Sequence, residues 1–103
     1  MIEISHATRK RIEAQFPKED WQRVSEHLLK ECGDNLPLVD SAYDALAERI
    51  RCAIVKLSAG NYEKLVQETA GAAKDWRDTL VVAGFVDDTK AHLSWLPDDD
   101  HDT

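Results

Sequence analysis

Two pairs of side chains have the spacing at which a helix brings metal ligands or acid–base groups together. His27 and Glu31 are four residues apart, as are Asp88 and His92, and residues at this spacing share one face of a helix. A structural zinc ion needs four protein ligands and a catalytic one three, and no His-Glu-x-x-His motif accompanies either pair. We therefore expect no metal site and no cofactor, and metal binding stays open only for Asp88 with His92.

The two cysteines, Cys32 and Cys52, are the candidate nucleophiles. Cys32 lies near the end of an expected helix, where the negative end of the helix dipole raises the pKa of a thiol. Arg51 precedes Cys52 and could in principle activate its thiolate. Adjacent helical residues point about 100° apart, however, which disfavours that contact. The four glycines stand alone, which is not the pattern of a phosphate-binding loop. We expect a protein that is not an enzyme, whose thiols serve as small apolar groups in a reducing compartment.

The tetrapeptide Asp75-Trp76-Arg77-Asp78 is the most distinctive run in the chain. Tryptophan and arginine are enriched at binding hot spots, so one interpretation is a recognition patch built from Arg77 and an indole ring. On a helix, however, Trp76 falls on the apolar stripe. The alternative is a packed core tryptophan, with Arg77 covering apolar surface and pairing with an acid. Bulky residues at helical spacing usually serve packing, which favours the second interpretation.

The net charge of −7 is unevenly distributed along the chain. The segment 97–103 holds four aspartates and no base, which leaves −3 for the rest. Nucleic-acid binding requires clustered lysines and arginines. The basic run Arg9-Lys10-Arg11 spreads around a helix, and we expect it to be a solvated face. The pattern predicts one folded domain over 1–96, no nucleic-acid partner, and a flexible acidic tail over 97–103.

Hydropathy predicts a cytoplasmic protein that has no membrane partner. No apolar run approaches the ~20 residues that span a bilayer. The first five residues, Met1 to Ser5, lack the apolar stretch and the small-residue cleavage site of a secretory signal.

Apolar residues recur every three to four positions from Ala42 to Leu96, which predicts an all-α fold, a small bundle of about five helices. The expected helices cover about 5–15, 17–32, 38–58 and 61–83, and the last runs from 87 or 88 to 96. Ser5 and Asn61 are expected to cap helix starts, and Gly84 is expected to end the fourth helix.

The third expected helix is apolar on two sides. One stripe consists of Tyr43, Leu46, Ile50, Ile54 and Leu57, and the other of Ala45, Cys52 and Val55. A helix with two apolar sides is usually packed on both, so we place it at the centre of the bundle. Gly71 weakens the fourth helix, and we expect a kink or split near 70–72.

Two stretches carry a resemblance to known proteins. They are RIRCAIVKLSAGN (49–61) and DWRDTLVVAGF (75–85), followed by His92 and Trp95. Together they resemble a group of small bacterial proteins of unassigned function, over about the C-terminal half of the chain. The resemblance implies a bacterial, cytoplasmic protein and brings no activity, ligand or catalytic residue.

Apolar residues crowd the carboxyl end of this small chain, and a surplus that the core cannot hide marks a partner surface. We therefore expect a protein–protein interaction module that self-associates as a two-fold dimer. The candidate surface consists of Arg77, Val82, Phe85, Val86, His92, Trp95 and Leu96. The alternative is an acidic inhibitor or immunity-type protein that occupies a basic site on a target protein. In that case charge would dominate binding.

Overall fold

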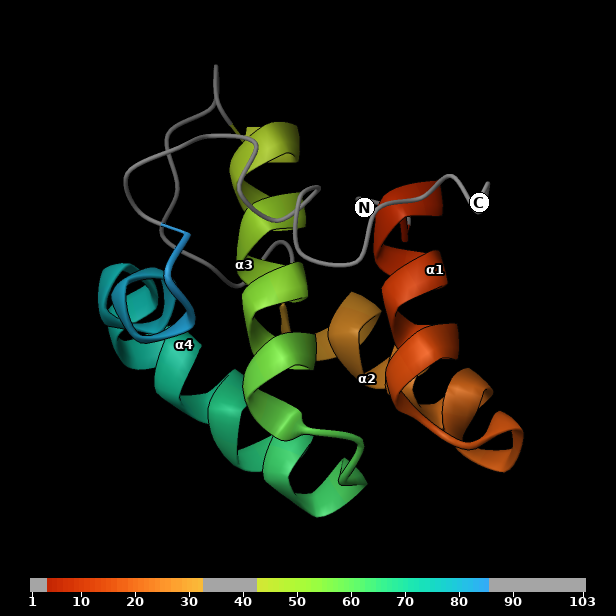
Figure 1. Ribbon diagram of the computed structural model, residues 1–103. Coiled ribbons are helices and arrows are strands. Elements are labelled where there is room, and N and C mark those ends of the chain that lie inside the picture. Colours follow the sequence, from red (N-terminus) through yellow and green to blue (C-terminus); the bar gives the residue numbers. More distant parts are fainter. Residues whose placement is uncertain (1–3, 33–42, 86–103) are drawn as a thin grey trace.

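The computed structural model describes residues 4–32 and 43–85, and every element within these ranges is helical (Figure 1). The elements are α1 (His6–Gln15), the short 3-10 helix η1 (Lys18–Asp20), α2 (Trp21–Glu31), α3 (Tyr43–Ser58) and α4 (Tyr62–Ala83). The expected all-α fold class is confirmed. The expected fifth helix and the acidic tail lie outside the described residues. Among those described, no helix is long and apolar enough to cross a membrane.

The turn between α1 and α2 is fixed by local hydrogen bonds. Ser5 caps α1 as expected, because its Oγ accepts the backbone N–H of Thr8 at 3.1 Å. Phe16 leaves the helix in an extended conformation before Pro17, as the residue before a proline tends to do. Its carbonyl accepts the indole N–H of Trp21 at 2.9 Å, which ties the start of α2 to the end of α1.

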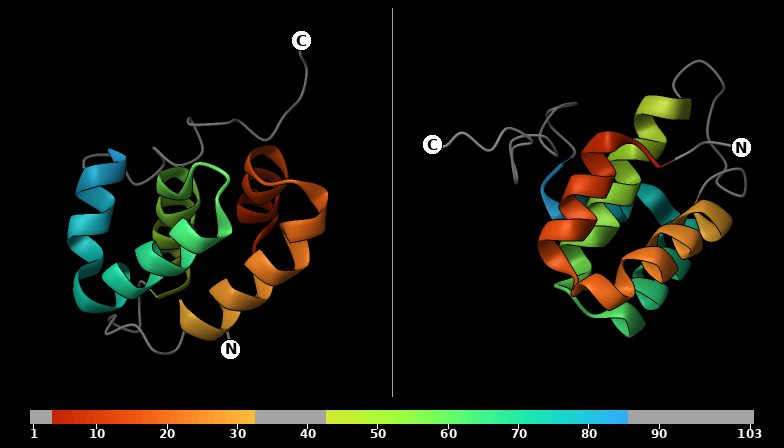
Figure 2. Two further views of the ribbon diagram at one scale, coloured as in Figure 1. Left: turned by 90° about the horizontal axis from the view of Figure 1, so that it is seen from below. Right: turned by 90° about the vertical axis from the view of Figure 1, so that its right-hand side faces the viewer.

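The middle of α3 is buried on every side. Residues 50–55 are six consecutive positions with at most 1% of each residue exposed. The helix contacts α1 along one side and α4 along another, and α2 packs against α1 and α4. Figures 1 and 2 show α3 between α1 and α4. This arrangement agrees with the central place expected from its two apolar stripes.

Two arginines lie inside this core, and one of them belongs to the run 9–11, which was expected to be a solvated face. Arg9 is exposed and Lys10 half-buried, but Arg11 is completely buried. Its Nη1 donates to the carbonyl of Ala7 at 2.7 Å. Arg51 is 1% exposed, and its Nε donates to the carbonyl of Cys32 at 2.7 Å. Such bonds offset the cost of removing a guanidinium from water, a compensation that charge patterning alone does not reveal.

Helix α4 is two helical segments joined by an elbow at Asp75 (φ −153°, ψ 86°). The expected kink at 70–72 is therefore wrong in its position. The Oδ1 of Asp75 accepts the backbone N–H of Asp78 at 3.3 Å, which is the bond of an N-cap residue starting a new helix. Figure 2 shows the two segments running in different directions.

The end of α4 is a Schellman motif, which confirms the expected stop at Gly84. Gly84 has the left-handed conformation (φ 80°), and its N–H donates to the carbonyl of Val81 at 3.1 Å. The N–H of Phe85 donates to the carbonyl of Leu80 at 2.9 Å. Both Phe85 and Leu80 are buried, which supplies the hydrophobic contact that accompanies this motif.

The turn between α3 and α4 requires glycine at position 60. Gly60 has φ +82°, and a Cβ on it would lie 2.5 Å from the backbone oxygen of Gln15 at the end of α1. Gly71, by contrast, lies within α4, and a Cβ there would meet nothing within 4 Å.

These two glycines give a matched pair of stability predictions. Gly60→Ala should lower the free energy of unfolding by about 1–3 kcal/mol, because it introduces backbone strain and a clash with Gln15. Gly71→Ala should raise it by about 0.5–1 kcal/mol, because alanine loses less entropy in a helix. Urea denaturation of both variants measures the difference. Equal effects of the two substitutions would contradict this account of the turn.

Candidate functional site

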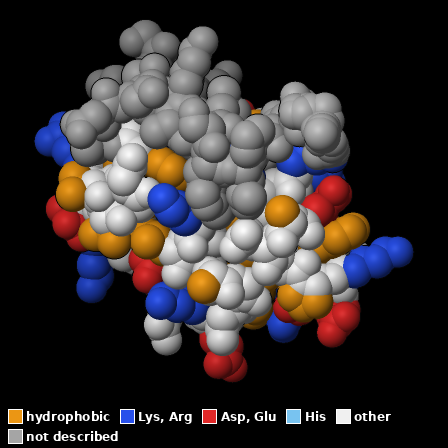
Figure 3. Space-filling view, viewed as in Figure 1, with side chains coloured by type: hydrophobic (Ala, Val, Ile, Leu, Met, Phe, Trp, Pro, Cys, Tyr) orange, Lys and Arg blue, Asp and Glu red, His pale blue; other side chains and the backbone are white. Residues whose placement is uncertain are grey.

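All three large hydrophobic side chains that are exposed in the described part of the chain belong to α4. Val66 is 36% exposed, Val81 56% and Val82 63%. Arg77 and Asp78, one turn before the two adjacent valines, are also exposed. We call Arg77, Asp78, Val81 and Val82 the α4 patch. Figure 3 shows hydrophobic side chains gathered at the left of the molecule, where Figure 1 draws the end of α4.

Two cations of α3 hold the segment that carries the α4 patch. The Nζ of Lys56 donates to the carbonyl of Ala83 at 2.8 Å and lies 5.0 Å from the ring centroid of Phe85. The Nη2 of Arg49 donates to the carbonyl of Phe85 at 2.6 Å. Cations at a helix C-terminus satisfy its unpaired carbonyls and oppose the negative end of the dipole. The inner face of the segment, Leu80 and Ala83, is buried.

The structure places only part of the expected interaction surface. Arg77 and Val82 are exposed and lie on the α4 patch. Phe85 is 1% exposed, so its inclusion in a docking surface is wrong: it closes the end of α4 and belongs to the core. Four more members of that surface lie outside the described residues: Val86, His92, Trp95 and Leu96.

The Asp75-Trp76-Arg77-Asp78 run combines packing with a helix start. Trp76 is half-buried and packs against the core, and the Arg77 guanidinium lies 5.2 Å from the Trp76 ring centroid. The capping role of Asp75 was missed. Its signal is an Asp followed three residues later by an acid, a variant of the capping-box spacing. The motif thus sets the direction in which the α4 patch points.

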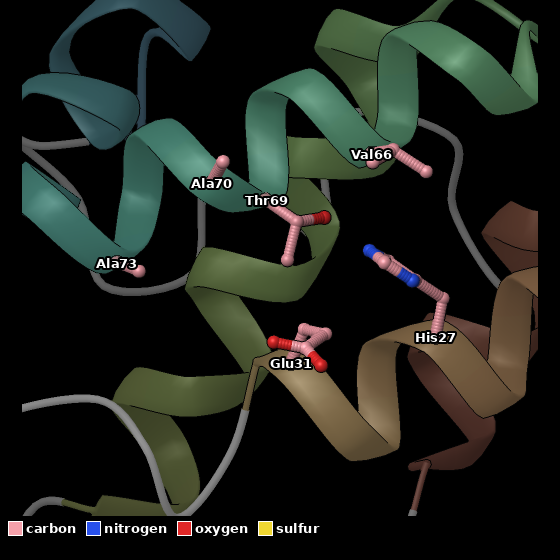
Figure 4. Close-up of a pocket in the computed structure, with 6 residues that line it drawn as sticks. All are labelled: His27, Glu31, Val66, Thr69, Ala70 and Ala73. Atoms are coloured by element: carbon pink, nitrogen blue, oxygen red, sulfur yellow. The ribbon is translucent and has the colours of Figure 1, made fainter.

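A groove of about 280 Å³ lies between the facing surfaces of α2 and α4 (Figure 4). Its lining residues are His27, Glu31, Val66, Thr69, Ala70 and Ala73. We call this feature the α2–α4 groove. The two α2 residues form one wall, and the α4 residues recur at the spacing of a single helix face. The His27–Glu31 pair noted from the sequence is thus brought to a cavity.

One end of the α2–α4 groove adjoins an aromatic and cationic cluster. The guanidinium of Arg23 lies 4.0 Å from the ring centroid of Tyr62, and His27 meets the same ring edge-on at 6.1 Å. Arg23 also pairs with Asp20 at 2.7 Å. These contacts fix the start of α2 against the start of α4.

Neither cysteine has the surroundings of a nucleophile. Both are completely buried and neither forms a disulfide. Burial raises the pKa of the Cys32 thiol from 9.0 to about 11, and the charge and hydrogen bond of Arg51 lower it only in part. The Sγ of Cys52 lies 3.6 Å from the hydroxyl of Thr8. A protonated, buried thiol is inert.

Within 4–32 and 43–85, no three His, Cys, Asp or Glu side chains gather at a point that could hold a metal ion. Asp88 and His92 fall outside these ranges. Comparison with protein-family models, with curated proteins and with solved structures found no match for this chain. The resemblance to small bacterial proteins therefore stays a prediction, and the argument about function rests on the geometry described above.

Lys56→Met should loosen the end of α4. The variant keeps the length of the side chain but loses the bond to the Ala83 carbonyl and the charge at the helix C-terminus. We expect the free energy of unfolding to fall by about 1–2 kcal/mol. The control is Lys64→Met, an exposed position in the first turn of α4, which should change stability by less than about 0.5 kcal/mol. Equal effects of the two substitutions in urea denaturation would contradict the stabilising role of Lys56 at the end of α4.

The buried Cys32 thiol makes stability depend on alkaline pH. The folded thiol keeps its proton to about pH 11, whereas an ordinary thiol loses it near 9.0. The unfolded state therefore binds fewer protons in this window, and the free energy of unfolding should fall as pH rises through it. Cys32→Ala should remove a part of this fall on the order of 2 kcal/mol. If the free energy of unfolding falls equally with pH in the unaltered chain and in Cys32→Ala, the buried Cys32 thiol is not the cause.

Proposed function

We propose that this chain is a non-enzymatic protein-interaction module that self-associates through the α4 patch. The observation that carries the proposal is the exposure of Val81 and Val82 at 56% and 63%, side by side on a segment whose other face is buried. The hydrogen bonds from Lys56 and Arg49 hold that segment before any partner arrives. A surface fixed in advance loses less entropy on binding.

A second copy of the chain is the partner that this patch suits. In a two-fold dimer the same surface faces itself, so it must be self-complementary. The α4 patch places one base and one acid, Arg77 and Asp78, beside an apolar pair. Two copies can therefore bury the valines together while opposite charges approach across the axis. Because the patch is small, the association is expected to be weak and transient.

A second candidate, an acidic inhibitor of a target that has a basic site, is favoured by one observation. The segment 97–103 carries four of the chain's acidic residues and no base. Such binding would depend on charge and weaken steeply with salt, whereas burial of the α4 patch would depend on apolar area.

The experiment is sedimentation velocity over a wide range of concentration. The chain should show reversible self-association, and the double variant Val81→Ser/Val82→Ser should stay monomeric because it removes the apolar centre. The control is Val66→Ser, which changes the third exposed valine of α4 outside the patch and should leave association unchanged. Circular dichroism checks that each variant folds.

Strictly monomeric behaviour of the unaltered chain at high concentration would overturn the self-association proposal. Deletion of 97–103 separates the two candidates. Loss of a salt-sensitive interaction with a target on this deletion would support the acidic inhibitor, and unchanged self-association would support the α4 patch.

A further inference from the structure

The α2–α4 groove combines an apolar floor with polar groups on one wall. Figure 4 shows Val66, Ala70 and Ala73 along α4 and the imidazole of His27 pointing toward α4 from α2, where Glu31 also lines the groove. At about 280 Å³, the groove is close to the lower end of the ~300–1,000 Å³ range of small-molecule pockets. It can take one short chain.

The polar groups of the groove are suited to accept hydrogen bonds. The Thr69 hydroxyl is buried and donates to the Leu65 carbonyl at 2.6 Å, so the polar groups that can meet a ligand are His27 and Glu31. A neutral imidazole carries one accepting nitrogen, and a carboxylate has about four acceptor positions. Glu31 can therefore accept from a ligand while keeping any contact within the chain.

No lysine or arginine lines this groove. Arg23, one turn before His27 on α2, is engaged with Asp20 and Tyr62. A comparable hollow of about 270 Å³ between α1 and α2 includes Arg9, so a base is already present there. Acceptors above an aliphatic floor, in a chain of net charge −7, favour a cationic ligand with an alkyl stem.

We propose that the α2–α4 groove binds a primary alkylammonium group. The alkyl chain lies along Val66, Ala70 and Ala73, and the ammonium donates to the Glu31 carboxylate, with His27 as a further acceptor. The three donors of the ammonium match the two carboxylate oxygens of Glu31 and one imidazole nitrogen of His27. The group has two sources, a small diamine in solution or a lysine side chain of another protein. The site does not depend on the self-association proposed for α4.

The test is a titration of ¹⁵N-labelled protein with 1,4-diaminobutane, followed by NMR. We expect saturable shifts of the amides of Glu31, Val66 and Ala70, with a dissociation constant of about 1 mM or tighter. A second arm uses a short lysine-containing peptide. Saturation by the diamine alone identifies a small amine as the source, and saturation by the peptide alone identifies a lysine side chain.

Matched variants separate a specific site from general attraction of cations. Glu31→Gln should weaken binding roughly tenfold, because the ammonium loses its charged acceptor. Glu26→Gln removes a carboxylate from the same helix outside the groove and should leave binding unchanged. Ala70→Leu, at an exposed position of α4, should block the floor without altering the circular dichroism spectrum.

Three results would overturn the proposal. One is the absence of saturation by either ligand at about 50 mM. Another is an equal loss for Glu31→Gln and Glu26→Gln, which would mean diffuse attraction to an acidic protein. The third is undiminished binding by Ala70→Leu, which would place the ligand elsewhere.

Discussion

The complete burial of six consecutive residues of α3, 50–55, is the constraint around which the rest of the structure is arranged. A helix has side chains all round, so such a run needs neighbours on every side. One of the six is Arg51, whose guanidinium must be hydrogen-bonded to lie there at all. Its bond to the Cys32 carbonyl joins the end of α2 to α3. Burial beside this contact keeps the Cys32 thiol protonated, although the charge of Arg51 opposes that effect.

The elbow in α4 follows from this arrangement. A straight helix could pack on α3 over only part of its length, and the cap at Asp75 lets the second segment change direction. Lys56 and Arg49, two turns apart on α3, donate hydrogen bonds to the carbonyls at the end of this second segment. The inner residues of that segment join the core, and Val81 and Val82 are left facing outward. The surface proposed for self-association is therefore a by-product of how α3 is covered.

Helical periodicity and capping residues predicted much of the fold. Ser5, Asn61 and Gly84 mark element ends as their chemistry suggests. The elbow was misplaced because Gly71 is a visible weak point, whereas the break at Asp75 depends on a side chain that can cap only once the helix has bent. The burial of Arg11 and Phe85 was missed for a related reason. The sequence alone does not show which charged or terminal residues another helix will cover.

The candidate site was predictable only in part. Exposure of Val82 was expected from the surplus of apolar residues at the end of a small chain, and Arg77 is exposed on the same patch. The α2–α4 groove could not be foreseen, because His27 and Glu31 predict a shared helix face but not what lies opposite. The small residues Ala70 and Ala73 leave a gap only because α4 crosses α2 at that point.

The most direct test of the central claim is an isotope-filtered NOE experiment on a mixture of ¹³C-labelled and unlabelled chains. It reports only contacts between different copies. The account predicts intermolecular NOEs from the methyl groups of Val81 and Val82 to the same patch of a second copy. Intermolecular NOEs that leave out these methyl groups, or none at a concentration where the unaltered chain is dimeric, would contradict it.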